Sequence, residues 1–181
     1  MVKHDQRSDY TSAKDHDKQG RHDRLLQERY DDPYRSDSKL KQPAICRQCK
    51  AVYVKGHWTL KQLTADEMAL AQQVMCPACQ RIHDNKAAAY LTISGDFMLD
   101  HQDEINGLIN HRCEQEHKLH PLKRIMTVEE RPDSQVYSFT DAHLARDIGV
   151  ALYKAYAGEL DCRYSKRTSI LRVRWSRSNN H

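Results

Sequence analysis

The residues of this chain with the clearest chemical potential are four cysteines arranged as two Cys-x-x-Cys pairs. Cys46 and Cys49 form the first pair, Cys76 and Cys79 the second, and 26 residues separate them. Alone, the second pair (Cys-Pro-Ala-Cys) suits both thiol oxidoreductases and zinc knuckles. Two such turns together supply the four thiolates of a tetrahedral zinc ion, with backbone N–H groups directed at the sulfurs. The duplicated spacing therefore predicts that these four cysteines bind one Zn²⁺.

Two other interpretations of the cysteines explain less. A redox pair formed by Cys76 and Cys79 accounts for one motif and leaves the other as coincidence, and small buried residues would account for neither spacing. Four protein ligands leave zinc no open position, so we expect a structural ion and not a catalytic one. Such an ion contributes on the order of 10 kcal/mol to the folding of a unit too small to have its own core.

Basic residues near the cysteines could balance a zinc tetrathiolate, which carries excess negative charge. We expect this role for four residues that are close in sequence, namely Arg47, Lys50, Lys55 and Arg81. His57 and His83 are also near enough to be considered as ligands. Because four cysteines already fill the coordination shell, both histidines are interpreted as exposed surface residues.

The stretch between the two pairs predicts the elements that hold them. β-favouring residues alternate around Lys55-Gly56, which indicates a hairpin. Thr64 and Glu67 then have capping-box spacing before a helix-friendly stretch. We therefore assign residues 43–86 to a zinc ribbon.

Residues 87–176 follow a different pattern. Alternating segments indicate strands, and two longer segments show helical periodicity, in the order β-α-β-β-α-β with a final hairpin. This order is typical of an α+β, ferredoxin-like split β-α-β sandwich, in which two helices pack on one face of an antiparallel sheet. The expected segments are strands within 88–97, 122–131, 135–140 and 160–175, and helices within 100–121 and 141–160.

The apolar positions of the two helices indicate which sides face the core. The first has a stripe of Ile105, Leu108, Ile109 and Cys113, and the second has Leu144, Ile148, Ala151, Leu152 and Ala155. Asp141 is placed to cap the second helix and Gly158 to end it. Cys113, on its stripe, and Cys162, in the alternation of a strand, are interpreted as small core residues.

Residues 1–42 contain many charges of both signs and almost no aliphatic side chains. Such a segment cannot bury enough apolar surface to order itself, so a mostly disordered tail is expected. Over the whole chain, 30% of the residues are charged and the mean hydropathy is −0.88. With no apolar run of membrane-spanning length and no secretory signal at the charged N-terminus, a cytoplasmic, non-membrane protein is expected.

The C-terminal segment is basic. In the strand around 171–175, Leu171, Val173 and Trp175 alternate with arginines, so one face should be apolar and the other cationic. Open sheet faces of this kind are common RNA platforms, and Tyr137 and Tyr164 are candidate stacking residues. The predicted nucleic-acid contacts are Arg163, Lys166, Arg167, Arg172, Arg174 and Arg177, the last beginning a short basic tail, residues 177–181.

No catalytic motif is evident. The chain has no Gly-rich phosphate loop followed by Lys-Ser/Thr, no Gly-x-Ser-x-Gly and no His-Glu-x-x-His. Asp141, His143 and Arg146 could be drawn as an acid–base set, but a helix cap explains Asp141 more simply. We therefore expect no enzymatic activity and no small-molecule substrate.

Several segments resemble a family of short bacterial proteins of unassigned function, described as relatives of the archaeal and eukaryotic adaptor for nuclear export of the large ribosomal subunit. The similar segments are "DPYRSDSKLKQPAICRQCKAVYVKGHW", "CPACQRIHD", "LTISGDF", "HPLKRIMTVEE", "FTDAHLARDIGVALYKAYAGELDCRY" and "LRVRW". The resemblance implies that the four paired cysteines are zinc ligands and that the partner is ribosomal. The adaptor is much longer and has more Cys-x-x-Cys pairs, so the resemblance does not imply export.

Three functional hypotheses follow. The leading one is a non-enzymatic, zinc-stabilised protein associated with RNA or ribosomes through phosphate contacts. The second is a protein–protein adaptor that docks through the zinc ribbon and the tail. The third is a thiol oxidoreductase that uses Cys76 and Cys79.

Overall fold

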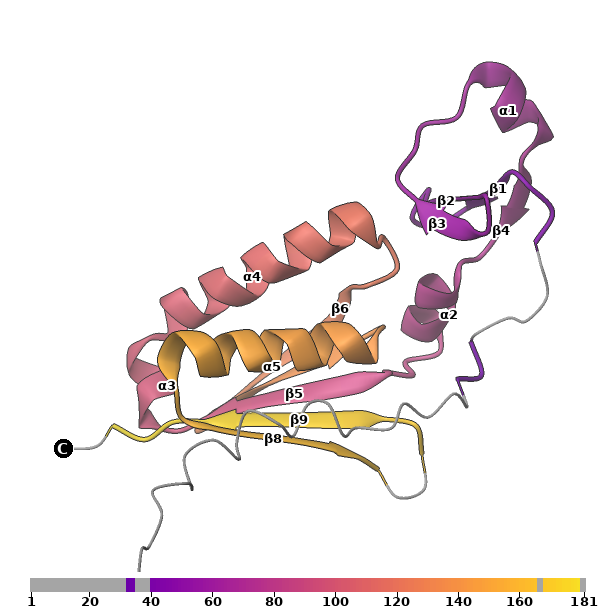
Figure 1. Cartoon of the computed structure of the whole chain (residues 1–181). Coiled ribbons are helices and arrows are strands. Elements are labelled where there is room, and N and C mark those ends of the chain that lie inside the picture. The colour runs from indigo at the N-terminus through magenta and orange to yellow at the C-terminus, as the bar shows by residue number, and fades with distance from the viewer. Residues whose placement is uncertain (1–31, 35–39, 166–167, 180–181) are drawn as a thin grey trace, which may run out of the picture.

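The computed structural model describes residues 32–34, 40–165 and 168–179. Within these ranges the chain forms two parts, each with its own sheet (Figure 1). The first, which we call the cysteine module, spans residues 44–83, and the second, the α/β domain, spans residues 89–176. The expected α+β class is confirmed. No helix in the described ranges is long and apolar enough to cross a membrane.

The cysteine module is built on a small four-stranded sheet in the order β3-β2-β1-β4. Its strands are β1 (Ala44–Cys46), β2 (Val52–Val54), β3 (His57–Thr59) and β4 (Gln72–Val74). The β2–β3 hairpin is the one predicted around Lys55-Gly56. Both turn residues have positive φ, 52° and 84°, as a tight two-residue hairpin turn requires.

Two helices complete the module, α1 (Ala65–Leu70) and α2 (Pro77–His83). The predicted capping box is present at α1: the Glu67 amide donates to Thr64 and the Thr64 amide donates to the Glu67 carboxylate. The helix-friendly stretch is shorter than its composition suggests, because β4 follows at residue 72. Its residues pair in parallel with β1, so tertiary pairing overrides local helix propensity there.

The α/β domain has a five-stranded sheet in the order β6-β7-β5-β9-β8. The elements in chain order are β5 (Ala89–Ser94), α3 (Asp96–Asp100), α4 (Gln102–Leu119), β6 (Ile125–Arg131), β7 (Ser134–Phe139), α5 (Ala142–Tyr156), β8 (Glu159–Tyr164) and β9 (Leu171–Ser176). This matches the predicted order of strands and long helices; the short helix α3 was not foreseen.

The arrangement of the strands differs from the prediction of an antiparallel, ferredoxin-like sheet. Strand β9 pairs in parallel with β5 and antiparallel with β8, so the sheet is mixed and β8 takes the edge. The physical reason is the final hairpin. Helix α5 delivers the chain to the edge, and β9 pairs on the inner side of β8, between β8 and β5, where it runs in the direction of β5.

Helices α4 and α5 lie side by side on one face of this sheet and cover its core (Figure 1). Ile105 and Ile109 of α4 and Leu144, Ile148 and Leu152 of α5 are fully buried, as their stripes predicted. Leu108, Cys113 and Cys162 pack against the same core from partly buried positions. Ala155 is exposed, contrary to the prediction.

Strand β9 has the predicted alternation. Leu171, Val173 and Trp175 are buried under the helices, while Arg172 and Arg174 are exposed on the opposite surface, which we call the open face. Helix α5 ends at Tyr156, and Ala157 occupies the cap position, one residue before the predicted Gly158. Gly158 follows with a φ of 87°, and a side chain there would collide with the Ser176 carbonyl, so glycine is required.

The predicted disordered tail falls mostly outside the described residues. Within it, Asp32, Pro33 and Tyr34 are described and lie against α2. The Arg81 side chain pairs with Asp32 and lies over the Tyr34 ring, whose hydroxyl donates to Asp84 at 2.8 Å. At the other end of the chain, the last two residues of the predicted basic tail are also outside the described ranges.

Candidate metal centre

Parallel pairing of β1 with β4 brings the two cysteine pairs together. Cys46 ends β1 opposite Val74, the last residue of β4, so the two parallel strands finish at the same end of the small sheet. The ladder continues as the Arg47 amide donates to the Val74 carbonyl at 2.9 Å. Cys76 follows β4 by two residues, and its amide donates to the Cys46 sulfur at 3.4 Å. This strand pairing, and not sequence proximity, forms the site.

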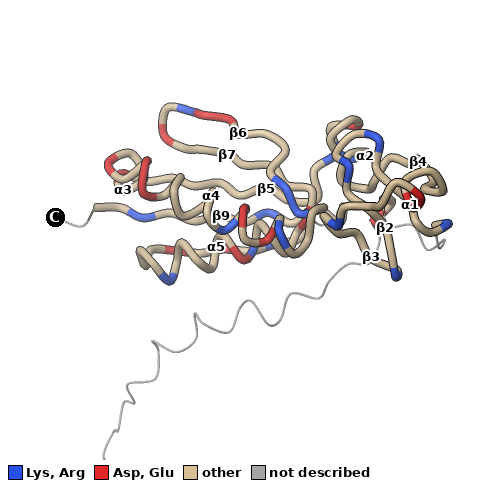
Figure 2. Tube along the Cα trace, turned by 90° about the horizontal axis from the view of Figure 1, so that it is seen from above, with Lys and Arg blue, Asp and Glu red and all other residues tan. Residues whose placement is uncertain are grey.

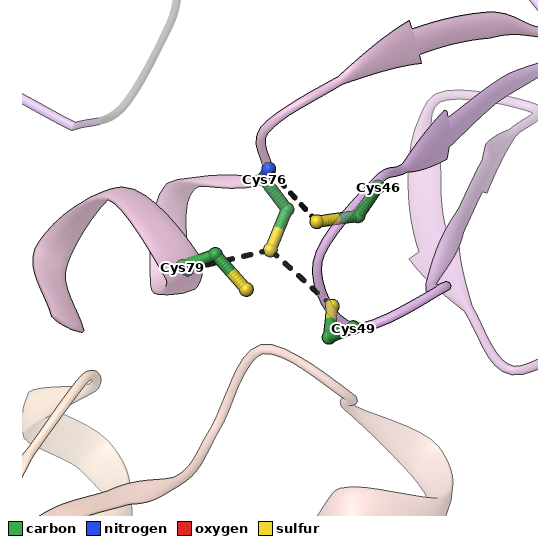
Figure 3. Close-up of side chains that lie close together, drawn as sticks. All are labelled: Cys46, Cys49, Cys76 and Cys79. Atoms are coloured by element: carbon green, nitrogen blue, oxygen red, sulfur yellow. Dashed lines mark hydrogen bonds between the residues drawn. The ribbon is translucent and has the colours of Figure 1, made fainter. Parts of the chain in front are cut away.

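The first pair lies on a tight turn that follows β1. The Lys50 amide donates to the Cys46 carbonyl at 2.9 Å, and the Cys46 amide donates to the Ala51 carbonyl at 2.8 Å. Lys50 has a φ of 63°, which lets the chain reverse immediately after Cys49. The turn thus directs the Cys46 and Cys49 sulfurs toward the second pair (Figure 3).

The second pair was predicted to form a turn like the first. It forms the first turn of a helix instead. Cys76 is the N-cap of α2, and its sulfur accepts the Cys79 amide at 3.4 Å. Pro77 occupies the first helical position, where a missing N–H has no cost and the fixed φ suits the helix. Pro77, which gave the second pair the Cys-Pro-x-Cys pattern shared by oxidoreductases and zinc sites, therefore begins α2. The helix N-terminus also favours negative charge on the sulfurs.

The four sulfurs form one compact cluster, which we call the Cys cluster. Their ligand atoms all lie within 4.8 Å of one another, and the Cys49 and Cys76 sulfurs are 3.6 Å apart (Figure 3). Zinc–sulfur bonds of about 2.3 Å place the sulfurs of a tetrahedral site roughly 3.8 Å apart. Spacing, ligand type and N–H···S hydrogen bonds all fit a metal ion held by Cys46, Cys49, Cys76 and Cys79. No other group with metal-site geometry occurs among the described residues.

The thiols of the cluster differ in acidity. Burial of Cys46 acts to raise the pKa of its thiol, but backbone N–H groups of Cys49, Cys76 and Gln48 lower that pKa to about 6. Burial raises the pKa of Cys49, and burial together with the neighbouring cysteine charges raises that of Cys76. A metal ion must therefore displace protons to bind here, so its affinity falls as the pH falls.

A residue that the sequence analysis missed contacts the sulfurs from the α/β domain. The Arg124 Nη2 group donates to the Cys79 sulfur at 3.2 Å and lies 3.9 Å from the Cys76 sulfur. Burial disfavours its charge, but the hydrogen bond to Cys79 and the cysteine charges outweigh burial and raise the pKa of Arg124. Arg124 lies 45 residues after Cys79, so no local sequence signal could have identified it.

The four basic residues predicted to balance the cluster have other positions. Arg47 is exposed, the Lys50 ammonium donates to the Arg47 carbonyl, and Lys55 is at the exposed tip of the β2–β3 hairpin. Arg81 is buried, but it pairs with Asp32 and donates to the Lys86 carbonyl at 3.1 Å. Among the described residues, the cation in contact with the sulfurs is Arg124.

The histidines considered as ligands lie apart from the Cys cluster. His57 is exposed at the β2–β3 turn, where its Nδ1 atom is 3.3 Å from the Lys55 carbonyl. His83 is exposed at the end of α2, and its Nδ1 atom is 2.9 Å from the Asp84 carboxylate. Their interpretation as surface residues is confirmed.

The predicted nucleic-acid residues that the structure describes lie in two places. Arg163, Arg172 and Arg174 share the open face, where Arg163 pairs in register with Arg172 and Arg174 with Asp161. Arg177 lies over the Phe97 ring at 3.9 Å and donates to the Tyr156 carbonyl at 2.7 Å, so it fastens the end of the sheet to α3 and α5. Lys166 and Arg167 lie outside the described residues.

The two tyrosines proposed for base stacking are not on the open face. Tyr137 is 4% exposed beneath the helices, where its hydroxyl lies 2.6 Å from Asn106 Oδ1 and 3.0 Å from Gln135 Oε1, with one proton to donate to either. Tyr164 packs against the same core. The alternation of β7 and β8 places both on the covered side. The aromatic residue of the open face is Tyr90, which pairs in register with Arg172 and lies 5.4 Å beneath its guanidinium group.

The predicted cap at Asp141 is confirmed, since its carboxylate accepts the Leu144 amide at 2.9 Å. Of the acid–base set drawn around it, His143 Nδ1 lies 3.6 Å from the Asp141 carboxylate, whereas Arg146 pairs with Asp147 at 3.8 Å. A groove of about 760 Å³ lies beside Asp141, between α2 and the start of β5. Its charged residues largely serve the structure: Arg81 pairs with Asp32, and Lys123 pairs with Glu116 at 2.7 Å.

No protein-family model matches this chain, and a search of curated proteins found no match. The assignment of a metal site therefore depends on the positions of the four sulfurs and their surroundings.

Proposed function

We propose that the chain is a non-enzymatic, zinc-stabilised protein that associates with RNA or ribosomes. The observation that carries the metal part is the gathering of four cysteines, from a turn and a helix N-terminus, into one cluster. Soft sulfur ligands in tetrahedral array suit zinc, and a closed shell of four protein ligands leaves no position for a substrate. A structural role for the ion follows from that closed shell.

Elemental analysis of the reduced, purified protein tests the metal assignment. One equivalent of zinc per chain is expected, and Cys79→Ser should lose it. Cys113→Ser is the matched control, since Cys113 is a partly buried cysteine that packs against the α/β core away from the cluster. Full-length protein that folds normally but retains no metal would refute the assignment.

The RNA part is supported by the chemistry of the open face. Tyr90, Arg172 and Arg163 form one row across β5, β9 and β8, and Arg174 lies in the next row beside Thr92. Arginine contacts phosphates, and a partly exposed aromatic ring such as that of Tyr90 can stack with an unpaired base. Figure 2 places acidic residues at the far β6–β7 hairpin, away from the cysteine module.

Acidic neighbours limit how strongly this face can bind RNA. Arg163 pairs with Asp161 at 2.8 Å, and Arg131 pairs with Glu129 at 3.0 Å. Arg172 and Arg174 are therefore the cations best placed to contact phosphates. Binding of modest affinity, governed by salt and with little base selectivity, is expected.

Binding of single-stranded RNA at several salt concentrations tests this interface. Replacing Arg172 and Arg174 together by Ala should weaken binding and reduce the slope of log affinity against log salt by about 1.4, for two lost phosphate contacts. Arg131→Ala, on the same face but ion-paired at the opposite edge, should leave both quantities near the wild-type values. Wild-type binding that is independent of salt would refute phosphate contact.

A protein partner is the second candidate, favoured by the surface around α1. No residue of α1 is buried, and Leu70 is 80% exposed, with Met68 and Leu60 nearby at 46% each. Exposed apolar side chains of this kind often mark protein contacts. Association that survives both nuclease and high salt but is lost in Leu70→Ser would favour this function over RNA binding.

The third hypothesis, a thiol oxidoreductase, needs only Cys76 and Cys79, whereas the structure gathers Cys46 and Cys49 with them. A dithiol reaction gives no reason for a four-sulfur cluster. Reversible disulfide cycling in metal-free protein would support this hypothesis, and bound zinc that protects all four cysteines from alkylation would oppose it.

A further inference from the structure

The segment that connects α4 to β6 is the part of the α/β domain that reaches the Cys cluster. Leu122 packs against the buried cysteines, and Arg124 places its guanidinium group beside two of the sulfurs. A ribbon in the salmon colour of this part of the chain passes close to the four cysteines in Figure 3. The cysteine module and the α/β domain therefore meet at the candidate metal site itself.

The backbone of this segment is held firmly on the α/β side. The Arg124 amide donates to the Thr140 hydroxyl at 2.8 Å, and the Thr140 amide donates to the Arg124 carbonyl at 3.0 Å. The Thr140 hydroxyl also donates to the Leu122 carbonyl at 2.6 Å. Thr140 precedes Asp141, the N-cap of α5, so Arg124 is anchored to the start of the main core helix.

The Arg124 side chain is well placed for the sulfurs and poorly placed for other acceptors. Its Nε atom is buried and has no hydrogen-bond partner among the described residues, while Nη2 is directed at Cys79 and Cys76. A half-buried cation without a compensating negative charge is costly. Four thiolates around a divalent ion carry excess negative charge, which such a cation can offset.

We propose that Arg124 is the charge partner of the metal-loaded Cys cluster, and that metal binding locks the cysteine module onto the α/β domain through this contact. The inference rests on the proposed metal site. When the ion is bound, the sulfurs present one fixed anionic surface to Arg124. When the ion is removed, the sulfurs lose their common centre, and the contact that joins the two parts weakens.

Metal affinity, measured by competition with a chromophoric chelator, tests the charge partnership. Arg124→Met keeps the length and apolar volume of the side chain but removes the charge, and it should lower zinc affinity about 10- to 100-fold, as loss of an outer-shell partner does. The zinc affinity of Arg124→Lys should lie between those of the wild type and Arg124→Met, because a single ammonium group replaces the planar guanidinium group.

Arg47→Met is the matched control, because Arg47 belongs to the first cysteine turn but is exposed. It should retain wild-type zinc affinity. Wild-type affinity in Arg124→Met would overturn the proposal. Failure of the wild-type protein itself to bind zinc would instead refute the metal site, so the two failures are distinguishable.

Hydrogen exchange of the wild-type protein tests the locking and does not depend on any variant folding. Chelation of the metal should increase amide exchange in residues 122–126 and 138–142, while β5 in the centre of the sheet serves as an internal standard. In Arg124→Met, amide exchange in residues 122–126 and 138–142 should already be raised with zinc bound. Unchanged exchange in residues 122–126 after chelation of the wild-type protein would overturn the locking.

Discussion

The cysteine module and the α/β domain are stabilised by different means. In the α/β domain, two helices bury a continuous apolar core that includes Leu91, Phe139, Ile148 and Trp175, each 0% exposed. In the cysteine module, the buried residues that join the turn to α2 are Cys46, Cys76, Cys79 and the small residue Ala78, and larger side chains such as Trp58 and Met75 pack against them only from partly buried positions. The sulfurs thus occupy the place that large apolar side chains hold in the domain.

The difference indicates how each part responds to disturbance. Burial of apolar surface is spread over many residues, so the α/β domain should lose stability in steps as single side chains are shortened. The cysteine module concentrates its stabilisation at one point, and a structural metal supplies folding free energy all at once. Metal removal, a cavity in the apolar core and loss of a helix cap separate these two behaviours, and their expected effects decrease in that order.

The largest effect should follow removal of the metal. Chelation at neutral pH should remove on the order of 10 kcal/mol from the cysteine module and unfold it, because a unit of this size has little core of its own. Hydrogen exchange should rise throughout residues 44–83, whereas the amides of the central strands β5 and β9 stay protected.

A matched experiment distinguishes metal loss from a general effect of the chelator. Cys46→Ser should produce the same loss of protection without any chelator, and Cys162→Ser, in the α/β domain, should not. Retained protection across residues 44–83 in metal-free protein would contradict the comparison between the two parts.

The next effect should follow a cavity in the α/β core. Leu91 is fully buried on the central strand β5, in register with Tyr137 on one side and Val173 on the other. Leu91→Ala should lower the free energy of unfolding of the domain by about 2–5 kcal/mol, measured by urea denaturation. Leu119→Ala is the control, since Leu119 is 72% exposed and should have almost no effect.

The same pair of variants sharpens the comparison. Zinc affinity of the folded Leu91→Ala protein should match that of the wild type, because the sulfurs are held by β1, β4 and α2. A large loss of affinity would show that the module depends on the stability of the whole domain and not on its local contacts.

A smaller effect is expected at the cap of α5. Asp141→Ala should lower the free energy of unfolding of the α/β domain by about 1 kcal/mol, because the Leu144 amide loses its acceptor. Burial acts to raise the pKa of Asp141, but His143 and the Leu144 amide outweigh it, and the folded-state pKa is lowered. A carboxylate whose pKa is lowered by folding stabilises the protein above its unfolded pKa, near 4, and loses that contribution as the pH falls through the folded pKa.

Asp141→Asn isolates this pH dependence. Asn caps a helix about as well as Asp but does not titrate in this range. The wild-type protein should therefore lose stability relative to Asp141→Asn as the pH falls below about 4. Both proteins release the metal alike in acid, so the difference between their urea midpoints reports Asp141. Equal pH profiles would contradict the role assigned to its charge.

Local patterns were sufficient to predict most elements of the fold. Apolar stripes located α4 and α5, and alternation located the strands of the α/β domain, because these periods reflect the local geometry of helices and strands. The order of the strands was not predictable in the same way. Whether β9 lies outside β8 or between β8 and β5 is decided by packing between distant segments, and the alternation within β9 is the same in both cases.

The candidate site shows the same division between local and distant information. The four cysteines were predicted because Cys-x-x-Cys spacing is a local signature of a metal site. Arg124 was not, since its contact with Cys79 depends on how the two parts meet. Tyr137 and Tyr164 were assigned to the wrong face, because alternation shows that two residues share a side but not which side the helices cover.

The smallest effect is expected at the other predicted cap, Thr64 at the start of α1. Thr64→Ala removes the acceptor for the Glu67 amide, as Asp141→Ala does for Leu144. A cap contributes about 1 kcal/mol to its own helix in either case. Because α1 buries no residue against the rest of the protein, that loss should remain within the helix.

Hydrogen exchange should therefore rise in residues 65–70 alone, while the urea midpoint and zinc affinity stay at wild-type values. Thr64→Ser, which keeps the hydroxyl group, should restore the protection. A shift of the global midpoint in Thr64→Ala would show that α1 is coupled to the Cys cluster, and the cysteine module would then resemble the α/β domain more closely than its contacts indicate.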